Sequence, residues 1–173
     1  RQQRAHILGV QGNIWTEWIG SVPLLFYMAL PRELALSEDG WTANAYKDWD
    51  SFETRMHSQY AWLQSESYNF RIPNPTFTVA DGGTLQYSAV APNIQAIAAQ
   101  TRARSVTVTL SDGDPDATIF YTTDGSTPDT HAKRYTGPLH IALSNGQTVR
   151  ITAAAILPSG RTSTTTTLEL RRR

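Results

Sequence analysis

The distribution of tryptophan and threonine divides this 173-residue chain into two parts. All five tryptophans lie before residue 74, whereas nineteen of the twenty-two threonines lie after residue 73. Threonine is β-branched and favours strands, so we expect the second part to be mainly β. The segment Arg71–Pro75 lies at the change, and its two prolines stiffen the chain and bar a helix. We therefore predict two domains, residues 1–73 and 74–173, joined by a short and rather rigid linker.

Charge and cysteine content exclude several classes of protein. Fifteen Lys and Arg balance fifteen Asp and Glu, and a nucleic-acid partner is not expected without a basic surplus. The chain has no cysteine, which rules out disulfides and thiol chemistry. No apolar run approaches about 18 residues, so no membrane-spanning helix is expected. Because the sequence begins at Arg1 without Met or a signal-like segment, we expect a fragment or a processed product.

Neither a metal nor a cofactor is expected. The four histidines, at positions 6, 57, 131 and 140, include no pair four residues apart, so a zinc site is not favoured. The run Asp112–Asp116 is rich in carboxylates and has two readings. A helix–loop–helix calcium site needs Gly at its sixth position and Glu at its twelfth, where this chain has Ala117 and Thr123. A turn before a strand is the favoured reading.

Residues 1–73 are predicted to contain one short strand followed by helices. Residues 7–10 form an apolar run of strand length. Ser21 is expected to cap a helix that reaches Leu30. The sequence then predicts a proline-started helix ending at Gly40, and a helix capped at Asp50 and ending near Asn69. The last helix has an apolar face at four spaced positions, Phe52, Met56, Tyr60 and Leu63.

This first part is not expected to bury its apolar side chains alone. One strand makes no sheet, and exposed Trp15, Trp18 and Phe26 would form a large apolar patch. A strand followed by helices is the repeating unit of an α/β barrel. We therefore expect residues 1–73 to be the end of a larger domain.

Residues 74–173 are predicted to form a small β-sandwich. Apolar residues alternate with polar ones around Val106–Leu110, Val149–Ala153 and Leu168–Leu170, as in half-buried strands. Turn signals at residues 124–125, 144–146 and 158–160 separate these runs. About 100 residues with regularly spaced turns are typical of a sandwich. Residues 74–104 are not assigned.

The densest set of candidate functional residues is the segment Gly9–Glu17. It follows the predicted strand directly, at the end where α/β barrels carry their active sites. In an extended chain Trp15 and Glu17 share one side, and a flat ring beside a carboxylate suits a sugar. The alternative, that Trp15 is core and Glu17 is a paired surface charge, stays open. For Arg32 and Glu38, a buried pair that fixes the helix to the barrel is favoured over a functional role.

Residues 1–73 resemble the end of a family-20 glycoside hydrolase, the β-N-acetylhexosaminidase family. The motifs that carry the resemblance appear in order as Ile7-Leu8-Gly9-Val10-Gln11-Gly12-Asn13-Ile14-Trp15-Thr16-Glu17, Ala29-Leu30-Pro31-Arg32 with Ala35, Glu38 and Trp41, Asp50-Ser51-Phe52 with Arg55, and Asn69-Phe70-Arg71-Ile72-Pro73. The resemblance implies that residues 7–17 are the eighth barrel strand and its loop. It also implies that Trp15 lines the terminal-sugar pocket and that Glu17 binds the 4- and 6-hydroxyls. Trp18 gains no such role.

The same resemblance implies catalysis by substrate-assisted retention, an exception to the usual two-carboxylate scheme. An adjacent Asp-Glu pair serves it, the Glu as acid and the Asp orienting the attacking acetamido group. This sequence contains no Asp-Glu dipeptide, and Glu38-Asp39 has the reverse order on a predicted outer helix, where a solvated surface pair is favoured. We therefore expect the chain itself to be inactive.

Residues 117–163 resemble a second module, the chitobiase/β-hexosaminidase C-terminal-type domain, an immunoglobulin-like sandwich. Its motifs here are Ile119-Phe120-Tyr121-Thr122-Thr123-Asp124-Gly125-Ser126-Thr127-Pro128, Tyr135, Pro138-Leu139 and Ala153-Ala154-Ala155 before Gly160. This resemblance implies a fold more than an activity. Tyr121 and Tyr135 are expected to pack, with stacking on sugar as the alternative.

Together these features favour the C-terminal portion of an exo-acting β-N-acetylhexosaminidase, with a barrel remnant and a sandwich. The resemblance implies three further properties: partners that are N-acetylhexosamine-terminated glycans or chitin-like oligosaccharides, a contact with the remainder of the barrel, and export to the periplasm or surface of a bacterium. The alternative function is a non-catalytic carbohydrate-binding or spacer module.

Overall fold

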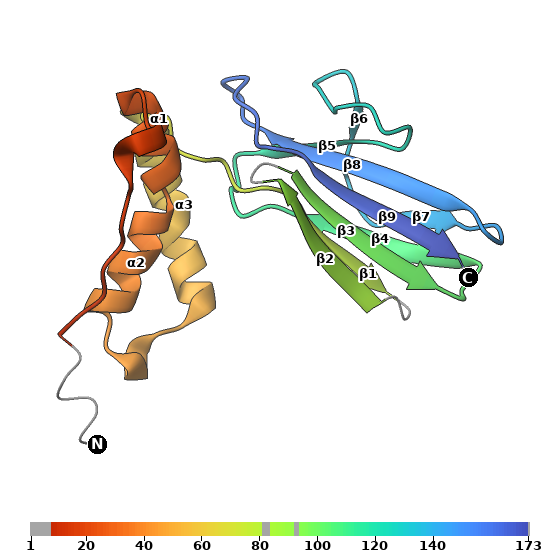
Figure 1. The fold of residues 1–173 in the computed structure, drawn as a ribbon, viewed down its shortest axis with the longest axis horizontal. Coiled ribbons are helices and arrows are strands. Elements are labelled where there is room, and N and C mark those ends of the chain that lie inside the picture. Colours follow the sequence, from red (N-terminus) through yellow and green to blue (C-terminus); the bar gives the residue numbers. More distant parts are fainter. Residues whose placement is uncertain (1–7, 81–83, 92–93, 173) are drawn as a thin grey trace. The chain divides into compact units, whose positions relative to one another are not determined.

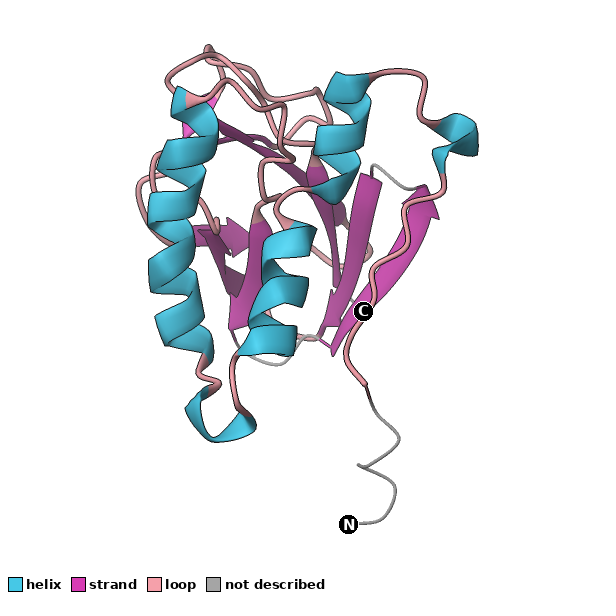
Figure 2. Ribbon diagram, turned by 90° about the vertical axis from the view of Figure 1, so that its left-hand side faces the viewer, coloured by secondary structure: helices cyan, strands magenta, loops and turns pink. Residues whose placement is uncertain are grey.

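The computed structural model describes residues 8–80, 84–91 and 94–172, and its chain divides into two compact units, Arg1–Arg71 and Ile72–Arg173. The helices lie in the first unit and the strands in the second (Figures 1 and 2). This division falls two residues before the boundary that the sequence predicts. No helix in the described part is long and apolar enough to cross a membrane.

The described part of the first unit has three helices, α1 (Val22–Ala29), α2 (Arg32–Trp41) and α3 (Trp49–Ser65), and two short 3-10 turns at Thr16–Trp18 and Asn44–Tyr46. Ser21 caps α1 as predicted, because its side chain accepts a hydrogen bond from the Leu24 amide. Pro23 stands in the first turn, where a missing amide hydrogen costs nothing.

The ends of α2 and α3 differ from the predicted ones. Gly40 lies inside α2, and α3 is capped by Asp48 rather than Asp50, since the Asp48 carboxylate accepts the Ser51 amide at 2.8 Å. The α3 helix stops at Ser65 and not near Asn69. Ser67 adopts φ 59° there, and the Tyr68 amide closes the end by donating to the Leu63 carbonyl.

The predicted apolar face of α3 is confirmed. Met56, Tyr60 and Leu63 are buried, and the Tyr60 ring stacks on buried Phe70 with centroids 5.7 Å apart. Residues 66–71 thereby return along the helices. The Arg71 amide donates to the Leu30 carbonyl, which fixes the end of this return beside the end of α1.

The predicted strand at residues 7–10 is not formed where the structure describes it. Residue 7 lies outside the described part, residues 8–10 are not strand, and Leu8 is 99% exposed. A lone extended segment has no ladder of backbone hydrogen bonds to define it, because no other strand of the described first unit lies beside it. The barrel remnant therefore stays a prediction.

In the second unit, the described strands form two sheets. The first, in the order β1-β4-β7, comprises β1 (Thr76–Ala80), β4 (Ser105–Ser111) and β7 (Leu139–Ala142). The second has the order β2-β3-β9-β8-β5-β6 and comprises β2 (Thr84–Ala91), β3 (Ile94–Thr101), β9 (Thr166–Arg172), β8 (Thr148–Ile156), β5 (Thr118–Thr122) and β6 (Lys133–Arg134). All neighbouring strands are antiparallel except β3 and β9, which are parallel.

Both sheets contribute to one apolar core, as the predicted alternation requires. Val106 and Val108 enter it from β4, and Ile151 and Leu168 enter it from β8 and β9. The polar neighbours on β4 point the other way, which gives the strand its alternating burial. Each of the three predicted turns contains a glycine with positive φ, namely Gly125, Gly146 and Gly160.

Strands β2 and β3 were not assigned from the sequence. Residues 94–101 carry three alanines and two glutamines beside two isoleucines, a composition with weak strand preference. Their strand state follows from pairing, since β3 lies between β2 and β9 with seven residues in register on each side. Such long-range pairing leaves little local signal in the sequence.

Candidate functional site

The segment Leu8–Glu17 lies on α2. A Cβ added to Gly12 would come within 2.7 Å of a Leu36 methyl group and 3.0 Å of a Glu33 carboxylate oxygen. A Cβ added to Gly40 would come within 2.9 Å of a Val10 methyl group. Two glycines on facing elements thus allow close approach, and they set the segment against the helix.

Trp15 and Glu17 follow this anchored stretch. Trp15 is 72% exposed and precedes the 3-10 turn Thr16–Trp18, which contains Glu17. The expectation that both side chains project from extended chain is therefore wrong for Glu17. The Glu17 side chain is exposed as well, so both side chains lie at the surface of the described first unit.

The predicted pair of Arg32 with Glu38 is not formed. Arg32 donates instead to the Met28 carbonyl at 2.8 Å, and burial together with the nearby charge of Arg71 lowers its pKa. A six-residue spacing places the two side chains on different sides of α2, whereas i, i+3 and i, i+4 neighbours meet. Glu38 pairs with Arg55 of α3, with Nη2 to Oε1 at 2.6 Å.

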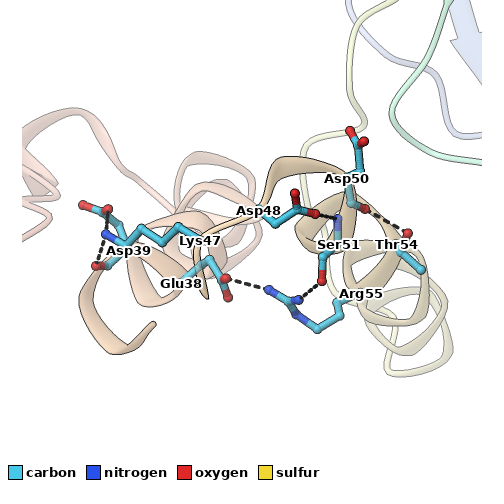
Figure 3. A network of polar contacts seen from close by, with 8 residues as sticks. All are labelled: Glu38, Asp39, Lys47, Asp48, Asp50, Ser51, Thr54 and Arg55. Atoms are coloured by element: carbon cyan, nitrogen blue, oxygen red, sulfur yellow. Dashed lines mark hydrogen bonds and ion pairs between the residues drawn. The ribbon is translucent and has the colours of Figure 1, made fainter. Parts of the chain in front are cut away.

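The Glu38–Arg55 pair belongs to a polar network that holds the loop between α2 and α3 (Figure 3). Arg55 Nη1 also donates to Ser51 Oγ at 2.6 Å, in the turn that Asp48 caps. At the other end of the loop, Lys47 pairs with the Asp39 carboxylate and donates to the Asp39 carbonyl. The reversed Glu38-Asp39 dipeptide therefore has two structural partners, in line with the favoured surface reading.

The run Asp112–Asp116 forms the predicted turn before β5. Asp112 Oδ1 accepts the Asp114 amide at 2.8 Å, and Asp114 Oδ1 accepts the Asp116 amide at 3.1 Å. Burial raises the pKa of Asp112 to about 7, and the charge of Asp114 adds to the shift. Asp114 also interacts electrostatically with Arg161, which follows β8 in the sequence. No local sequence pattern predicts this distant partner.

The structure supplies no further metal ligands for that turn. Among the described residues, no group of three or more His, Asp or Glu side chains is placed to hold a metal ion. His57 and His131 are exposed, and His140 lies within 3.2 Å of Thr107 Oγ1 on the outer side of β7. His6 lies outside the described residues.

The two tyrosines considered for sugar stacking are part of the sandwich. Tyr121 and Tyr135 are half-buried and pack against its core. The Tyr135 hydroxyl accepts a hydrogen bond from the Leu110 amide at 3.1 Å, which fixes its ring. The packing reading is thereby supported for both rings.

Two family models match separate parts of the chain. Residues 1–44 match the glycosyl hydrolase family 20 catalytic domain, and residues 97–167 match the chitobiase/beta-hexosaminidase C-terminal domain. The second match reaches twenty residues further toward the N-terminus than the resemblance drawn from the sequence. Residues 45–73, which include α3, lie outside both matches.

Three curated relatives have closely similar names. A "Beta-hexosaminidase" of Porphyromonas gingivalis is 29% identical over 149 residues, or 86% of this chain. A "Beta-hexosaminidase" of Akkermansia muciniphila is 31% identical over 61 residues, 34% of this chain, and a "Beta-N-acetylhexosaminidase" of Cellulomonas fimi is 40% identical over 50 residues, 29% of this chain. The chain spans 17%, 12% and 10% of the lengths of these relatives.

The order of the two matches agrees with the order of the two motif sets. The segment that carries Trp15 and Glu17 falls in the first match, and most of the sandwich core falls in the second. Residues 1–44 are thus similar to the family-20 glycosyl hydrolase catalytic domain, and residues 97–167 are similar to the chitobiase/beta-hexosaminidase C-terminal domain.

Proposed function

We propose that the whole protein is an exo-acting bacterial β-N-acetylhexosaminidase that removes terminal N-acetylhexosamine from glycans or chitin-like oligomers. This proposal rests on the comparisons. The two family matches follow one another along the chain, and three bacterial relatives are named as hexosaminidases. This chain holds only a small share of each relative's length, so the activity is assigned to the complete polypeptide.

The exposed side chains of the first unit support a larger catalytic domain. Trp15 and Trp18 are largely exposed, together with Leu8, Val10 and Val22 of the same unit. An apolar surface of this extent is typical of an interface rather than of a monomer surface. We propose that residues 1–73 complete a (β/α)8 barrel, and that residues 7–10 become its last strand when the neighbouring strands supply hydrogen-bond partners.

Within that barrel, Trp15 and Glu17 are assigned to the terminal sugar. The indole ring stacks on the C–H face of the sugar, and the Glu17 carboxylate accepts hydrogen bonds from its 4- and 6-hydroxyls. Their exposure supports this assignment, because neither side chain is used in the packing of the described unit. Gly12 and Gly40 support it further, because the close contacts there hold the preceding stretch against α2.

The catalytic pair is proposed to lie in the part of the polypeptide outside this sequence, which contains no Asp-Glu dipeptide. There a Glu protonates the leaving oxygen while an Asp orients the substrate's acetamido group for attack on the anomeric carbon. Water then opens the resulting intermediate with retention of configuration. A location in the periplasm or at the bacterial surface is part of the same proposal.

The test is hydrolysis of a chromogenic N-acetylglucosaminide by the whole protein and by the 173-residue chain. Turnover by the whole protein and none by the chain is expected. The absence of turnover by the whole protein on both gluco and galacto substrates would contradict the proposed activity and favour the non-catalytic module. Turnover by the pure chain would contradict the placement of the catalytic pair.

A further inference from the structure

A groove of about 350 Å³ separates α2 from α3 in the first unit. Neither Trp15 nor Glu17 lines it. Its walls combine aliphatic, aromatic and polar side chains, and those used below are Ser37, Glu38 and Trp41 of α2 and Phe52, Arg55 and Gln59 of α3. This volume and this mixture are typical of small-molecule sites.

The aromatic side of the groove offers flat faces to solvent. Trp41 ends α2 and is 91% exposed, although it lines the groove. Phe52 lines the facing helix, and the exposed ring of Trp49 packs against it with centroids 5.7 Å apart. Two aromatic rings thus line the groove, and a third packs against one of them. Such rings combine a large apolar contact area with little conformational entropy to lose.

The polar side of the groove is held in place before any ligand binds. Arg55 bonds to Glu38 Oε1 and to Ser51 Oγ, both at 2.6 Å, so its guanidinium is oriented (Figure 3). Those bonds occupy two of its five N–H donors. The second carboxylate oxygen of Glu38 and the amide of Gln59 add further acceptors and donors. Fixed donors and acceptors of this kind match neighbouring hydroxyls, each of which both donates and accepts.

We propose that this α2–α3 groove binds a neutral saccharide, with a pyranose ring on Trp41 and its hydroxyls on the Glu38–Arg55 pair. A wholly apolar occupant would bury the charged pair without new hydrogen bonds, which is costly. A polyanion is disfavoured because the two charged side chains that line the groove, Glu38 and Arg55, balance each other. The groove itself does not depend on the proposed hydrolase activity; only the choice of N-acetylglucosamine oligomers as the first probes rests on it.

The experiment uses the 173-residue chain, so no hydrolysis enters the measurement. A panel of the trisaccharides of N-acetylglucosamine, glucose in β-1,4 linkage and glucose in α-1,4 linkage is titrated against isotope-labelled protein, with amide shifts followed by NMR. Saturable binding is expected, with the largest shifts at Ser37, Trp41, Arg55 and Gln59. No saturable shift with any member of the panel would overturn the proposal, whereas the hydrolase proposal would still be judged on turnover by the whole protein.

Two pairs of variants locate the binding. Trp41→Ala is expected to weaken saccharide binding about tenfold or more, because it removes a stacking contact. Gln59→Ala is expected to weaken binding several-fold. Both positions are exposed, and circular dichroism checks that each variant is folded. Trp15→Ala and Trp62→Ala are the matched controls, since each removes an exposed indole that does not line the groove. Full affinity in Trp41→Ala with loss in Trp15→Ala would place the saccharide on the Trp15–Glu17 segment and overturn the proposal.

Discussion

Arg55 Nη2 donates a hydrogen bond to Glu38 Oε1 at 2.6 Å, and this ion pair joins α3 to α2. The two residues are seventeen positions apart in the sequence and come from different motif segments. Glu38 is mostly covered, whereas the Arg55 side chain is about half exposed. Water therefore weakens the attraction, and the pair serves orientation more than stability.

Glu38→Gln should lower the stability of the first unit by no more than about 1 kcal/mol, as for a partly exposed ion pair. Because all five tryptophans lie in residues 1–73, tryptophan fluorescence during urea unfolding reports on this unit alone. The difference from the unsubstituted chain should shrink in about 1 M salt, where the Debye length is about 3 Å. Glu169→Gln is the control, since its pair with Arg150 lies in the second unit and should not move this signal. A salt-independent difference would contradict the electrostatic account.

The second unit should fold without the first, and its start matters. Ile72 is 2% exposed, and Asn74 Oδ1 accepts a hydrogen bond from Thr164 Oγ1 at 2.7 Å. Residues 72–173 should therefore melt cooperatively, and at a higher temperature than residues 74–173, because burying an isoleucine side chain contributes about 1.5–3 kcal/mol. Circular dichroism of both pieces makes the comparison. Equal melting temperatures would contradict the assignment of Ile72 to the second unit, and loss of cooperativity in both would contradict its independence.

Local patterns predicted those elements whose cause is local. The Ser21 cap, the apolar face of α3 and the alternation in β4 each follow from spacings within a few residues, and each is confirmed. The strand at residues 7–10 depends on distant partners, and residues 8–10 do not form it in the described structure. The expected pairing of Arg32 with Glu38 is wrong. Strand β3 was missed for the same reason, because β2 and β9 stabilise it from outside its own sequence.

The candidate site divides in the same way. The sequence predicted an aromatic ring and a carboxylate after an apolar run. It did not predict the 3-10 turn, which contains Glu17 and leaves Trp15 in an extended conformation before it. The α2–α3 groove was not visible either. Its lining residues come from two helices. The i, i+3 and i, i+4 spacings predict contacts within one helix and say nothing about contacts between two helices.

Ionisation of Asp112 should make the second unit less stable at neutral pH than at acid pH. Burial raises the pKa of this carboxyl to about 7 in the folded chain, against about 4 when unfolded. Between these values the folded state holds a proton that the unfolded state has lost, so stability falls as pH rises from about 4 to about 7 and is level above. The full difference is at most a few kcal/mol, since the residue is only partly buried.

Asp112→Asn isolates this contribution. Asparagine keeps an oxygen that can accept the Asp114 amide but carries no charge. The stability gained by Asp112→Asn should therefore be near zero at pH 4 and should grow to its maximum near pH 8. Urea titrations followed by the NMR signals of the core residues Ile151 and Leu168 measure it at each pH. Asp124→Asn is the control, because hydrogen bonds from Ser126 lower the pKa of that exposed carboxyl, and it should show no gain between pH 4 and 8. A gain in Asp112→Asn that is constant with pH would contradict the raised pKa.

Glu17→Gln in the whole enzyme should impair catalysis while leaving stability unchanged. The Glu17 carboxylate is exposed and takes no part in the packing of the described unit. A hydrogen bond to a charged group contributes about 1.5–3 kcal/mol. At about 1.4 kcal/mol for each factor of ten, kcat/KM should fall about 10- to 100-fold.

The substrate and the neighbouring tryptophans supply the controls for Glu17→Gln. The loss should be smaller on a substrate without 4- and 6-hydroxyls, because the unsubstituted enzyme then has no such bonds to form. Trp15→Ala should cost at least as much as Glu17→Gln, since it removes the stacking face. Trp18→Ala, which removes a similarly exposed indole that has no proposed contact with the sugar, should leave kcat/KM nearly unchanged in the folded protein. A lowered melting temperature with intact kcat/KM in Glu17→Gln would contradict the sugar-binding role. It would assign Glu17 to packing within the complete barrel, because a purely structural contact affects stability and not catalysis.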